Sequence, residues 1–96
     1  MKKALLQNKN QTVTPTTSGA AAAFSSVTDN GRLMEVSVKA NSANSGAIYI
    51  RAGATGDFVP LNAEDSATFI VNDTADLVAY SDNGTEVANC IIHTTY

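Results

Sequence analysis

Four short segments between residues 46 and 92 alternate apolar and polar side chains, and this pattern limits the chain to β structure. The segments read AIYIRA, ATFIV, DLVAY and EVANCII, and the gaps between them contain Gly, Asp, Asn or Pro. Strict alternation over about four to eight residues is typical of strands that turn one face toward a core. We therefore predict an all-β fold, a small antiparallel β-sandwich or barrel.

The length of the chain, 96 residues, allows one domain with one modest core. Domains of this size bury a smaller share of their surface than larger ones and often rely on disulfides, metals or oligomerisation. Cys90 is the single cysteine and His93 the single histidine, so neither an internal disulfide nor a structural zinc site is expected. We expect a homo-oligomer, in particular a trimer, with no metal and no cofactor.

The charge is divided unevenly along the chain. Lys2, Lys3 and Lys9 precede every acid, and the body from Asp29 onward holds nine acids against three basic residues. The first part therefore carries +3 and the body −6, which sum to the net charge of −3. An acidic body disfavours nucleic acid as a partner, because phosphate contacts need a basic face. A short basic segment is instead suited to an acidic protein surface.

Residues 1–19 predict an extended N-terminal arm, and residues 20–96 a β domain. The arm ends in TVTPTTSG and lacks apolar periodicity. Two compatible interpretations are that a neighbouring subunit or host surface holds the arm, or that it folds back as an edge strand through residues 11–14. The apolar run at residues 4–6 is too short for a secretory signal or a membrane span, so no membrane partner is expected.

The first half of the predicted β domain contains a turn between two candidate strands. Residues 20–28 read AAAAFSSVT, which favours a strand with Phe24 facing inward, since the alanine run is too short for a stable helix. Asn30-Gly31 predicts a type I′ hairpin turn. The next segment alternates, and its predicted inward face is Met34, Val36, Val38 and Ala40.

The second half contains more apolar side chains than one inward face accounts for. Pro60 bars a central position in a sheet, yet apolar residues surround it in the loop that follows residue 52. Residues 67–71 are apolar on both faces, which suits a sandwich whose outer face is covered by another subunit. The predicted subunit interface consists of Phe58, Val59, Leu61, Phe69 and Val71.

Catalytic chemistry has little support in the sequence. Cys90 and His93 are three residues apart on a predicted strand, so their side chains point to opposite faces and cannot form a nucleophile–base pair. Cys90 is expected to be a small buried apolar residue, and His93 a surface or subunit-contact residue. We expect no catalytic residue and no enzymatic activity.

Acidic residues in two turns could bind calcium in principle. They are Asp73 with Asp76, and Asp82 with Glu86. Neither pair has the spacing or the number of oxygen ligands of a calcium loop. We favour the interpretation in which these side chains accept hydrogen bonds from the local backbone and fix the turns.

The segment 46–92 resembles small all-β virion proteins of tailed bacteriophages over about half of the chain. The matching stretches are Ile48-Tyr49-Ile50, VPLNAEDS at residues 59–66, and DLVAYS at residues 76–81. Asp65 departs from the Gly-Glu order of that pattern, and the arm has no counterpart in it. The resemblance implies a structural role in a phage particle, as a head decoration (cement) protein or a head-fibre base.

On this resemblance we expect a decoration protein that binds and stabilises the head shell through its arm and through apolar subunit contacts. The partner would be the major capsid protein or another virion protein. The protein would be made in the host cytoplasm and would then lie on the capsid surface. The predicted capsid-binding residues are Lys2, Lys3, Leu5, Leu6 and Lys9. The alternative is a carbohydrate- or host-surface-binding β module of a fibre, which would use Tyr49, Arg51 and Tyr80.

Overall fold

The computed structural model describes residues 7–95, with residues 7 and 8 described by their backbone only. Within this range the elements are β1 (Gln7–Val13), η1 (Ser18–Ala20), β2 (Ala22–Ala23), β3 (Met34–Ala40), β4 (Ile48–Ala52), β5 (Val59–Leu61), β6 (Ser66–Val71), η2 (Thr74–Asp76), β7 (Leu77–Ser81) and β8 (Glu86–Thr95). The two η elements are single 3-10 turns. The predicted all-β fold is confirmed.

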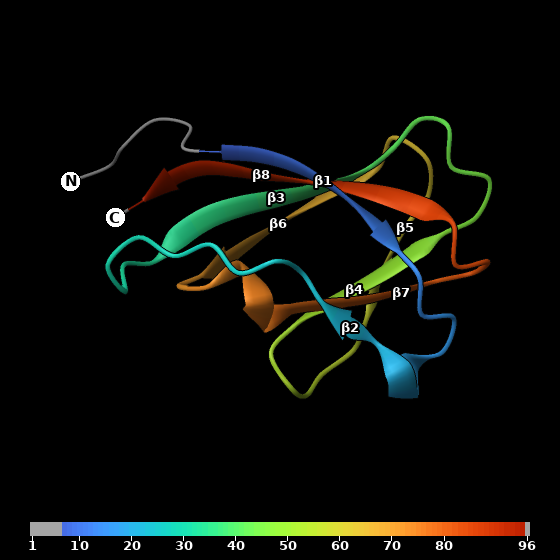
Figure 1. Ribbon diagram of the computed structural model, residues 1–96, viewed down its shortest axis with the longest axis horizontal. Helices are drawn as coiled ribbons and strands as arrows, with labels where there is room; N and C mark the ends of the chain where they lie inside the picture. The colour runs from blue at the N-terminus through green and yellow to red at the C-terminus, as the bar shows by residue number, and fades with distance from the viewer. Residues whose placement is uncertain (1–6, 96) are drawn as a thin grey trace.

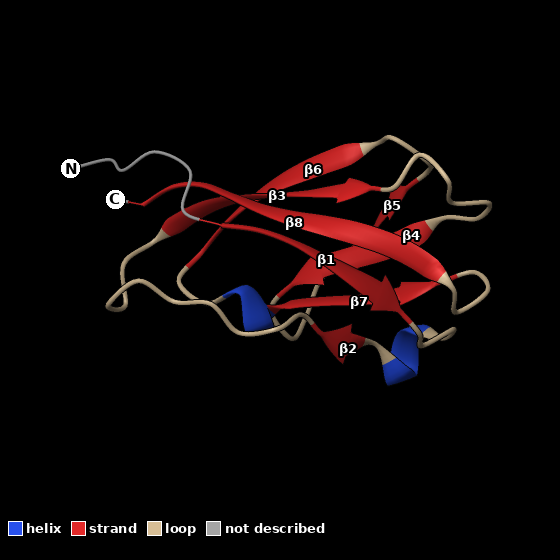
Figure 2. Cartoon of the chain, turned by 45° about the horizontal axis from the view of Figure 1, so that its top comes forward, coloured by secondary structure: helices blue, strands red, loops and turns tan. Residues whose placement is uncertain are grey.

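The strands form two four-stranded antiparallel sheets that pack face to face. Sheet A has the order β1-β8-β3-β6 and sheet B the order β2-β7-β4-β5. Figure 1 shows β1, β8 and β3 of sheet A across the upper part of the molecule and β4, β7 and β2 of sheet B below them, and Figure 2 shows the same strands after a 45° turn. The fold is therefore a β-sandwich, one of the two architectures expected.

The strands pair as in one long hairpin, the first with the last and so on inward, and this hairpin is folded over into two sheets. Strand β1 pairs with β8, β2 with β7, β3 with β6, and β4 with β5. The additional pairs β3–β8 and β4–β7 join these ladders into the two sheets. This arrangement of eight strands in two sheets is the jelly-roll topology. Among the described connections, β4–β5 alone joins neighbours within one sheet, and every other connection crosses from sheet to sheet.

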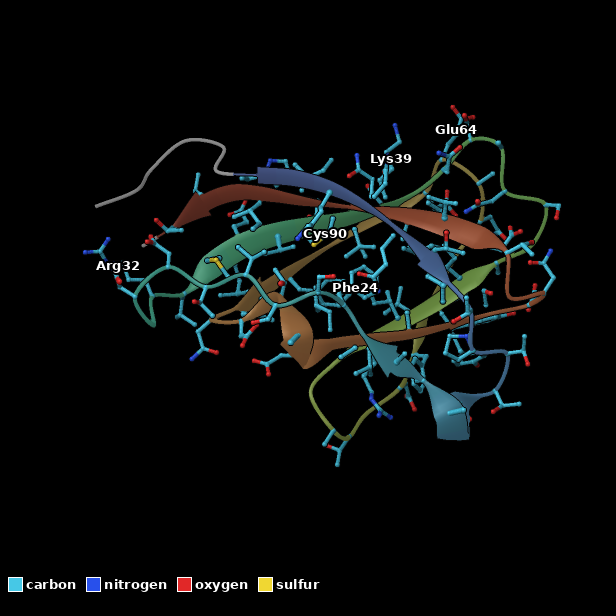
Figure 3. The ribbon with its side chains drawn as sticks, in the orientation of Figure 1. Phe24, Arg32, Lys39, Glu64 and Cys90 are labelled. Atoms are coloured by element: carbon cyan, nitrogen blue, oxygen red, sulfur yellow. The ribbon has the colours of Figure 1, made fainter. Side chains whose placement is uncertain are left out.

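The core between the sheets follows the alternation of the sequence. Along β3 the burial pattern is strict, with Met34, Val36, Val38 and Ala40 inside, as predicted. Ile48 and Ile50 of β4 and Leu77 of β7 are fully buried against them. Figure 3 shows Phe24 between the two layers, and its side chain is 3% exposed. Its predicted inward orientation is confirmed, although β2 itself spans two residues rather than the whole of residues 20–28.

The turn at Asn30-Gly31 has the predicted backbone but a different role. Asn30 and Gly31 have φ values of +52° and +76°, and the backbone N–H of Arg32 donates to the carbonyl of Asp29 at 2.9 Å. Positive φ at both central residues is the I′ geometry. However, the turn lies in the crossing from sheet B to sheet A, so the predicted hairpin is wrong. The short pairing of β2, which uses Ala22 and Ala23 against β7, leaves the residues before the turn outside any ladder.

The N-terminal part of the chain belongs to the sandwich from residue 7 onward. Strand β1 pairs with β8 from Gln7↔Ile92 to Val13↔Glu86. Val13 is buried, and its carbonyl accepts a hydrogen bond from Ser81 Oγ at 2.8 Å. Of the two interpretations of the arm, the edge strand is thus present, longer than the expected 11–14. Residues 7–13 therefore form part of the domain rather than a separate arm.

Strand β8 contains one irregularity, at His93. In the pairing with β3, Glu35 lies opposite Thr94 and Val36 opposite Ile92, so His93 is the extra residue of a β-bulge. Its Nε2 lies 2.8 Å from Ser37 Oγ, which shows that the ring is on the outer face of sheet A. Cys90 is buried on the inner face. The prediction that Cys90 and His93 point to opposite faces is confirmed.

Candidate functional site

The outer face of sheet B holds an aromatic cluster, which we define as Tyr49, Arg51, Phe58 and Tyr80. Tyr49 of β4 and Tyr80 of β7 are directly opposite in the antiparallel register, and their rings stack with centroids 4.6 Å apart and an interplanar angle of 13°. Phe58, just before β5, meets Tyr80 edge-on at 5.0 Å and 79°. The alternation of the strands therefore brings together side chains that the sequence separates.

Arg51 completes the cluster with a positive charge. Its guanidinium carbon lies 4.4 Å from the centre of the Phe58 ring, which is a cation–π contact. Its Nε donates to the carbonyl of Gly53 at 3.2 Å. The guanidinium is thus held over an aromatic face by two contacts while its side chain is half-buried.

An acid lies beside the stacked rings. A hydrogen bond to Asp82 is the main cause of a raised pKa at Tyr49, and burial and the negative charge of Asp82 add to it. Asp82 also accepts from the backbone N–H of Ala47, at 3.0 Å from Oδ2. The aromatic cluster therefore combines three partly exposed rings with a cation and a carboxylate. Such a surface can pack against the apolar face of a sugar or against side chains of a protein partner.

The outer face of sheet A carries a second feature, a polar hollow of about 290 Å³. Its floor is a row across three strands, in which Asn10 of β1 pairs with Asn89 of β8, and Asn89 with Lys39 of β3. Loop residues form the walls, and the lining is Asn10, Lys39, Ala40, Asn41, Ser42, Glu64 and Asn89. Figure 3 shows Lys39 and Glu64 near one another at the upper edge of sheet A.

Glu64 is held above the hollow by a turn. The backbone N–H of Glu64 donates to Ala40 at 3.0 Å, and the N–H of Asp65 donates to Asn62 at 2.9 Å. Glu64 has a φ of +72°, which a type II turn requires at its third position and which glycine normally supplies. On the floor, Asn89 Oδ1 is buried without a hydrogen-bond partner among the described residues. The hollow therefore offers amide, ammonium and carboxylate groups that suit water or a small polar molecule.

The predicted subunit interface is not one surface. Leu61 and Val71 are 2% and 5% exposed and belong to the core of the single chain, so their prediction as interface residues is corrected. Phe69 is half-buried and packs against the same core. Phe58 belongs to the aromatic cluster on the other sheet. Val59, at 41% exposure, is the member of the set with an exposed side chain.

The sequence interpretation missed Ile70, which is 51% exposed on the outer face of sheet A. The interface prediction took Phe69 and Val71 as outward-facing, although their face of the strand also carries Ala67 and the opposite face carries Thr68 beside Ile70. The pairing with β3 decides the orientation: Phe69 is opposite the buried Val36, and Ile70 is opposite Glu35. Leu33, just before β3, is also 51% exposed.

Four of the predicted capsid-binding residues, Lys2, Lys3, Leu5 and Leu6, lie outside the described residues. Lys9 is exposed on β1, directly opposite Cys90 in the register. Residues directly opposite in an antiparallel ladder share a face, so Lys9 lies on the inward side of an edge strand.

The acidic turn residues have structural roles. Asp73 Oδ1 accepts hydrogen bonds from the backbone N–H of Ala75 at 2.9 Å and from Ser26 Oγ at 2.8 Å, and these bonds, chiefly the first, lower the pKa of Asp73. Glu86 is buried and accepts from the backbone N–H of Gly46 at 2.6 Å. The bond from Ala75 to Asp73 is the local, turn-fixing contact expected from the sequence, whereas Glu86 contacts the backbone of a loop that is distant in the sequence. Within residues 7–95 no group of three or more His, Cys, Asp or Glu side chains could hold a metal ion.

Comparisons with family models, with curated proteins and with solved structures give no match to this chain. In the part of the chain that the structure describes, no helix is long and apolar enough to cross a membrane.

Proposed function

We propose that this protein is a structural component of a bacteriophage particle, a decoration (cement) protein that binds the head shell. The observation that carries the proposal is the jelly-roll order of the strands, β1-β8-β3-β6 and β2-β7-β4-β5. Jelly rolls recur in viral capsid domains, and this is an argument by analogy of fold. The resemblance of the segment 46–92 to small phage virion proteins supports the same role.

The proposed attachment uses the N-terminal segment. Lys2, Lys3, Leu5 and Leu6 precede β1, and Lys9 is exposed on that strand, whereas the rest of the chain is acidic. A short basic segment ahead of an acidic body suits an acidic groove between capsid proteins. Several copies bound to one shell would hold it more tightly than a single contact does.

Co-sedimentation with phage heads tests this role. Full-length protein is expected to pellet with heads that lack it, and a variant without residues 1–6 is expected to stay in the supernatant. The control is Arg32→Ala, which removes an exposed cation from another loop and is expected to pellet normally. Equal pelleting of the truncated and full-length proteins would refute attachment through this segment.

The aromatic cluster favours a second candidate function, a carbohydrate- or host-surface-binding module. Stacked rings beside Arg51 and Asp82 form a surface of the type that binds sugars through their apolar faces. The chain has no tryptophan, so its intrinsic emission comes from Tyr49 and Tyr80 of the cluster together with Tyr96. Saturable quenching by a sugar that is lost in Tyr80→Ala and kept in Thr12→Ala, on the other sheet, would support this function; no binding on a glycan array would exclude it.

A further inference from the structure

Strand β6 is an edge strand to which residues 7–95 give none of the usual protection against pairing with another chain. The sandwich has four edges, β1 and β6 in sheet A and β2 and β5 in sheet B. Free N–H and C=O groups on an edge are a template for a further strand, and proteins block them with short strands, prolines, bulges or inward-pointing charges. Whether each edge has such a device decides where pairing can occur.

Three of the four edges are protected. Strand β2 has two residues, and β5 has three with Pro60 at its centre. Strand β1 carries Lys9 on its inward side, opposite Cys90. Each of these features blocks or weakens the addition of a strand.

Strand β6 differs on every count. It reads SATFIV, with no charge, proline or glycine, and it pairs with β3 over six consecutive residues without a bulge. Ala, Thr, Phe, Ile and Val in an uncharged run are typical of segments that pair readily between chains. Ile70 exposes 51% of its surface beside the free edge, and no described strand lies beyond it.

We propose that β6 pairs with β6 of a second copy of this chain, antiparallel, so that the two copies of sheet A become one continuous sheet. A two-fold axis perpendicular to the sheet relates the copies, and the contact is therefore self-complementary. This inference goes beyond the proposed function, since it holds whether or not the protein lies on a virion.

The requirement that outer side chains stay outside restricts the register. Residues directly opposite each other must share a face, so the two residue numbers must add to an even sum. For strand β6, Ser66–Val71, two registers meet this condition and pair the largest number of residues. One is centred on Thr68 and the other on Phe69. They differ in the acids at the ends of the strand.

Charge selects the register centred on Thr68. When the register is centred on Phe69, the numbers of opposite residues add to 138, so Asp65 of each copy lies opposite Asp73 of the other. Centring on Thr68 gives a sum of 136, which places Asp65 opposite Val71 and Asp73 opposite Ala63. Like charges directly opposite are destabilising, and this register avoids them.

The resulting contacts suit the side chains. On the outer face Thr68 meets its own copy, and Ile70 lies opposite Ser66; on the inner face Ala67 lies opposite Phe69. Thr–Thr pairs across strands can hydrogen-bond. An interface formed by one short edge is small, so we expect the dimer fraction to rise with protein concentration.

Cross-linking at the two-fold axis tests the register. In Thr68→Cys the two new thiols face each other, and mild oxidation is expected to give a covalent dimer. The control Thr12→Cys places an exposed cysteine on β1, the opposite edge of the same sheet. We expect about tenfold less dimer from it, because a disulfide needs Cα atoms within about 7 Å. The wild-type chain controls for Cys90, which is buried.

Solution mass measured by light scattering or sedimentation gives the second readout. Wild-type protein is expected to approach the mass of two chains as concentration rises. Thr68→Lys sets like charges face to face and is expected to be monomeric, whereas Thr12→Lys is expected to dimerise like wild type. Circular dichroism and thermal unfolding check that both variants are folded.

Each contrary result overturns the proposal. A wild-type chain that stays monomeric at every concentration, a trimer whose Thr68→Cys variant does not cross-link, a dimer that survives Thr68→Lys, or equal cross-linking at positions 12 and 68 would exclude the β6–β6 contact. Its failure leaves the pelleting test with phage heads unaffected, so the two proposals can be judged separately.

Discussion

At the scale of single residues, Glu64 occupies a position that favours glycine. Its φ of +72° costs a residue with a long side chain about 1 kcal/mol or more, and its carboxylate lines the polar hollow. We predict that Glu64→Gly raises the free energy of unfolding by about 1 kcal/mol, because glycine adopts this conformation without strain. Urea unfolding measures the change.

The matched control for Glu64→Gly is Asn30→Gly. Asn30 also has a positive φ, +52°, but asparagine tolerates this region better than glutamate. We expect a smaller gain at position 30. Equal gains at both positions, or a loss at position 64, would show that backbone strain is not what distinguishes Glu64.

Cys90 gives a prediction for pH dependence. Burial raises the pKa of its thiol to about 11, and the charge of Lys9 opposes this. Since the folded pKa lies above the ordinary value of 9.0, the neutral thiol favours folding. That contribution is complete below about pH 9 and is lost as the pH rises through 11.

Two measurements follow for Cys90. A thiol reagent at pH 8 is expected to label it slowly in the native protein and rapidly in urea. Between pH 9 and 11 the stability of wild-type protein is expected to fall more than that of Cys90→Ala, which lacks the thiol. Fast native labelling at pH 8 would show that the thiol is not buried.

At the scale of elements, β1 is expected to contribute to the stability of the domain. Removing residues 1–6 leaves every described strand in place, so we predict cooperative thermal unfolding close to that of the full chain. Removing residues 1–18 deletes β1, the buried Val13 and the acceptor of the Ser81 hydroxyl. Loss of such a side chain alone costs about 1–4 kcal/mol, so we predict a large fall in melting temperature or loss of folding.

A longer truncation that melted like the full chain would contradict this role of β1. It would restore the original interpretation of residues 1–19 as a separate arm. The outcome also matters for the binding test. A variant that lacks β1 could fail to bind heads because it does not fold, rather than because it lacks the binding segment. The six-residue truncation avoids this ambiguity.

The sequence predicted the strands better than their partners. Alternation is a local property, and it placed β3, β4, β7 and β8 and the inward side chains of β3. Sheet order depends on contacts between distant segments, and most connections of this fold cross between sheets. The type I′ turn at Asn30-Gly31 therefore predicted a hairpin that the topology does not contain.

The candidate sites were less predictable for the same reason. Tyr49, Arg51 and Tyr80 were grouped from the sequence, and the structure adds Phe58 to them. The polar hollow joins β1, β3 and β8 with two loops, a combination that no local pattern indicates. At β6 both faces carry a large apolar side chain, and the pairing with β3 shows that Phe69 faces the core while Ile70 is exposed.

At the scale of the whole molecule, the two proposed contacts use opposite edges of sheet A. Strand β1, next to the proposed shell-binding segment, is one edge, and β6 is the other. Pairing through β6 therefore leaves β1 of both copies unpaired on its outer side. A dimer would then carry two shell-binding segments, and linked sites bind more tightly than either site does alone.

The topology also predicts how the chain folds. The outermost pair of the wrapped hairpin joins Gln7 to Ile92, so nearly the whole chain must be ordered before β1 can pair. Folds dominated by such distant contacts refold in roughly milliseconds to seconds, and domains of this size unfold in one step. We predict one cooperative transition in urea and single-exponential refolding on that timescale, measured by tyrosine fluorescence in a stopped-flow instrument. Refolding within microseconds, or two separate transitions, would mean that part of the sandwich is stable without the rest.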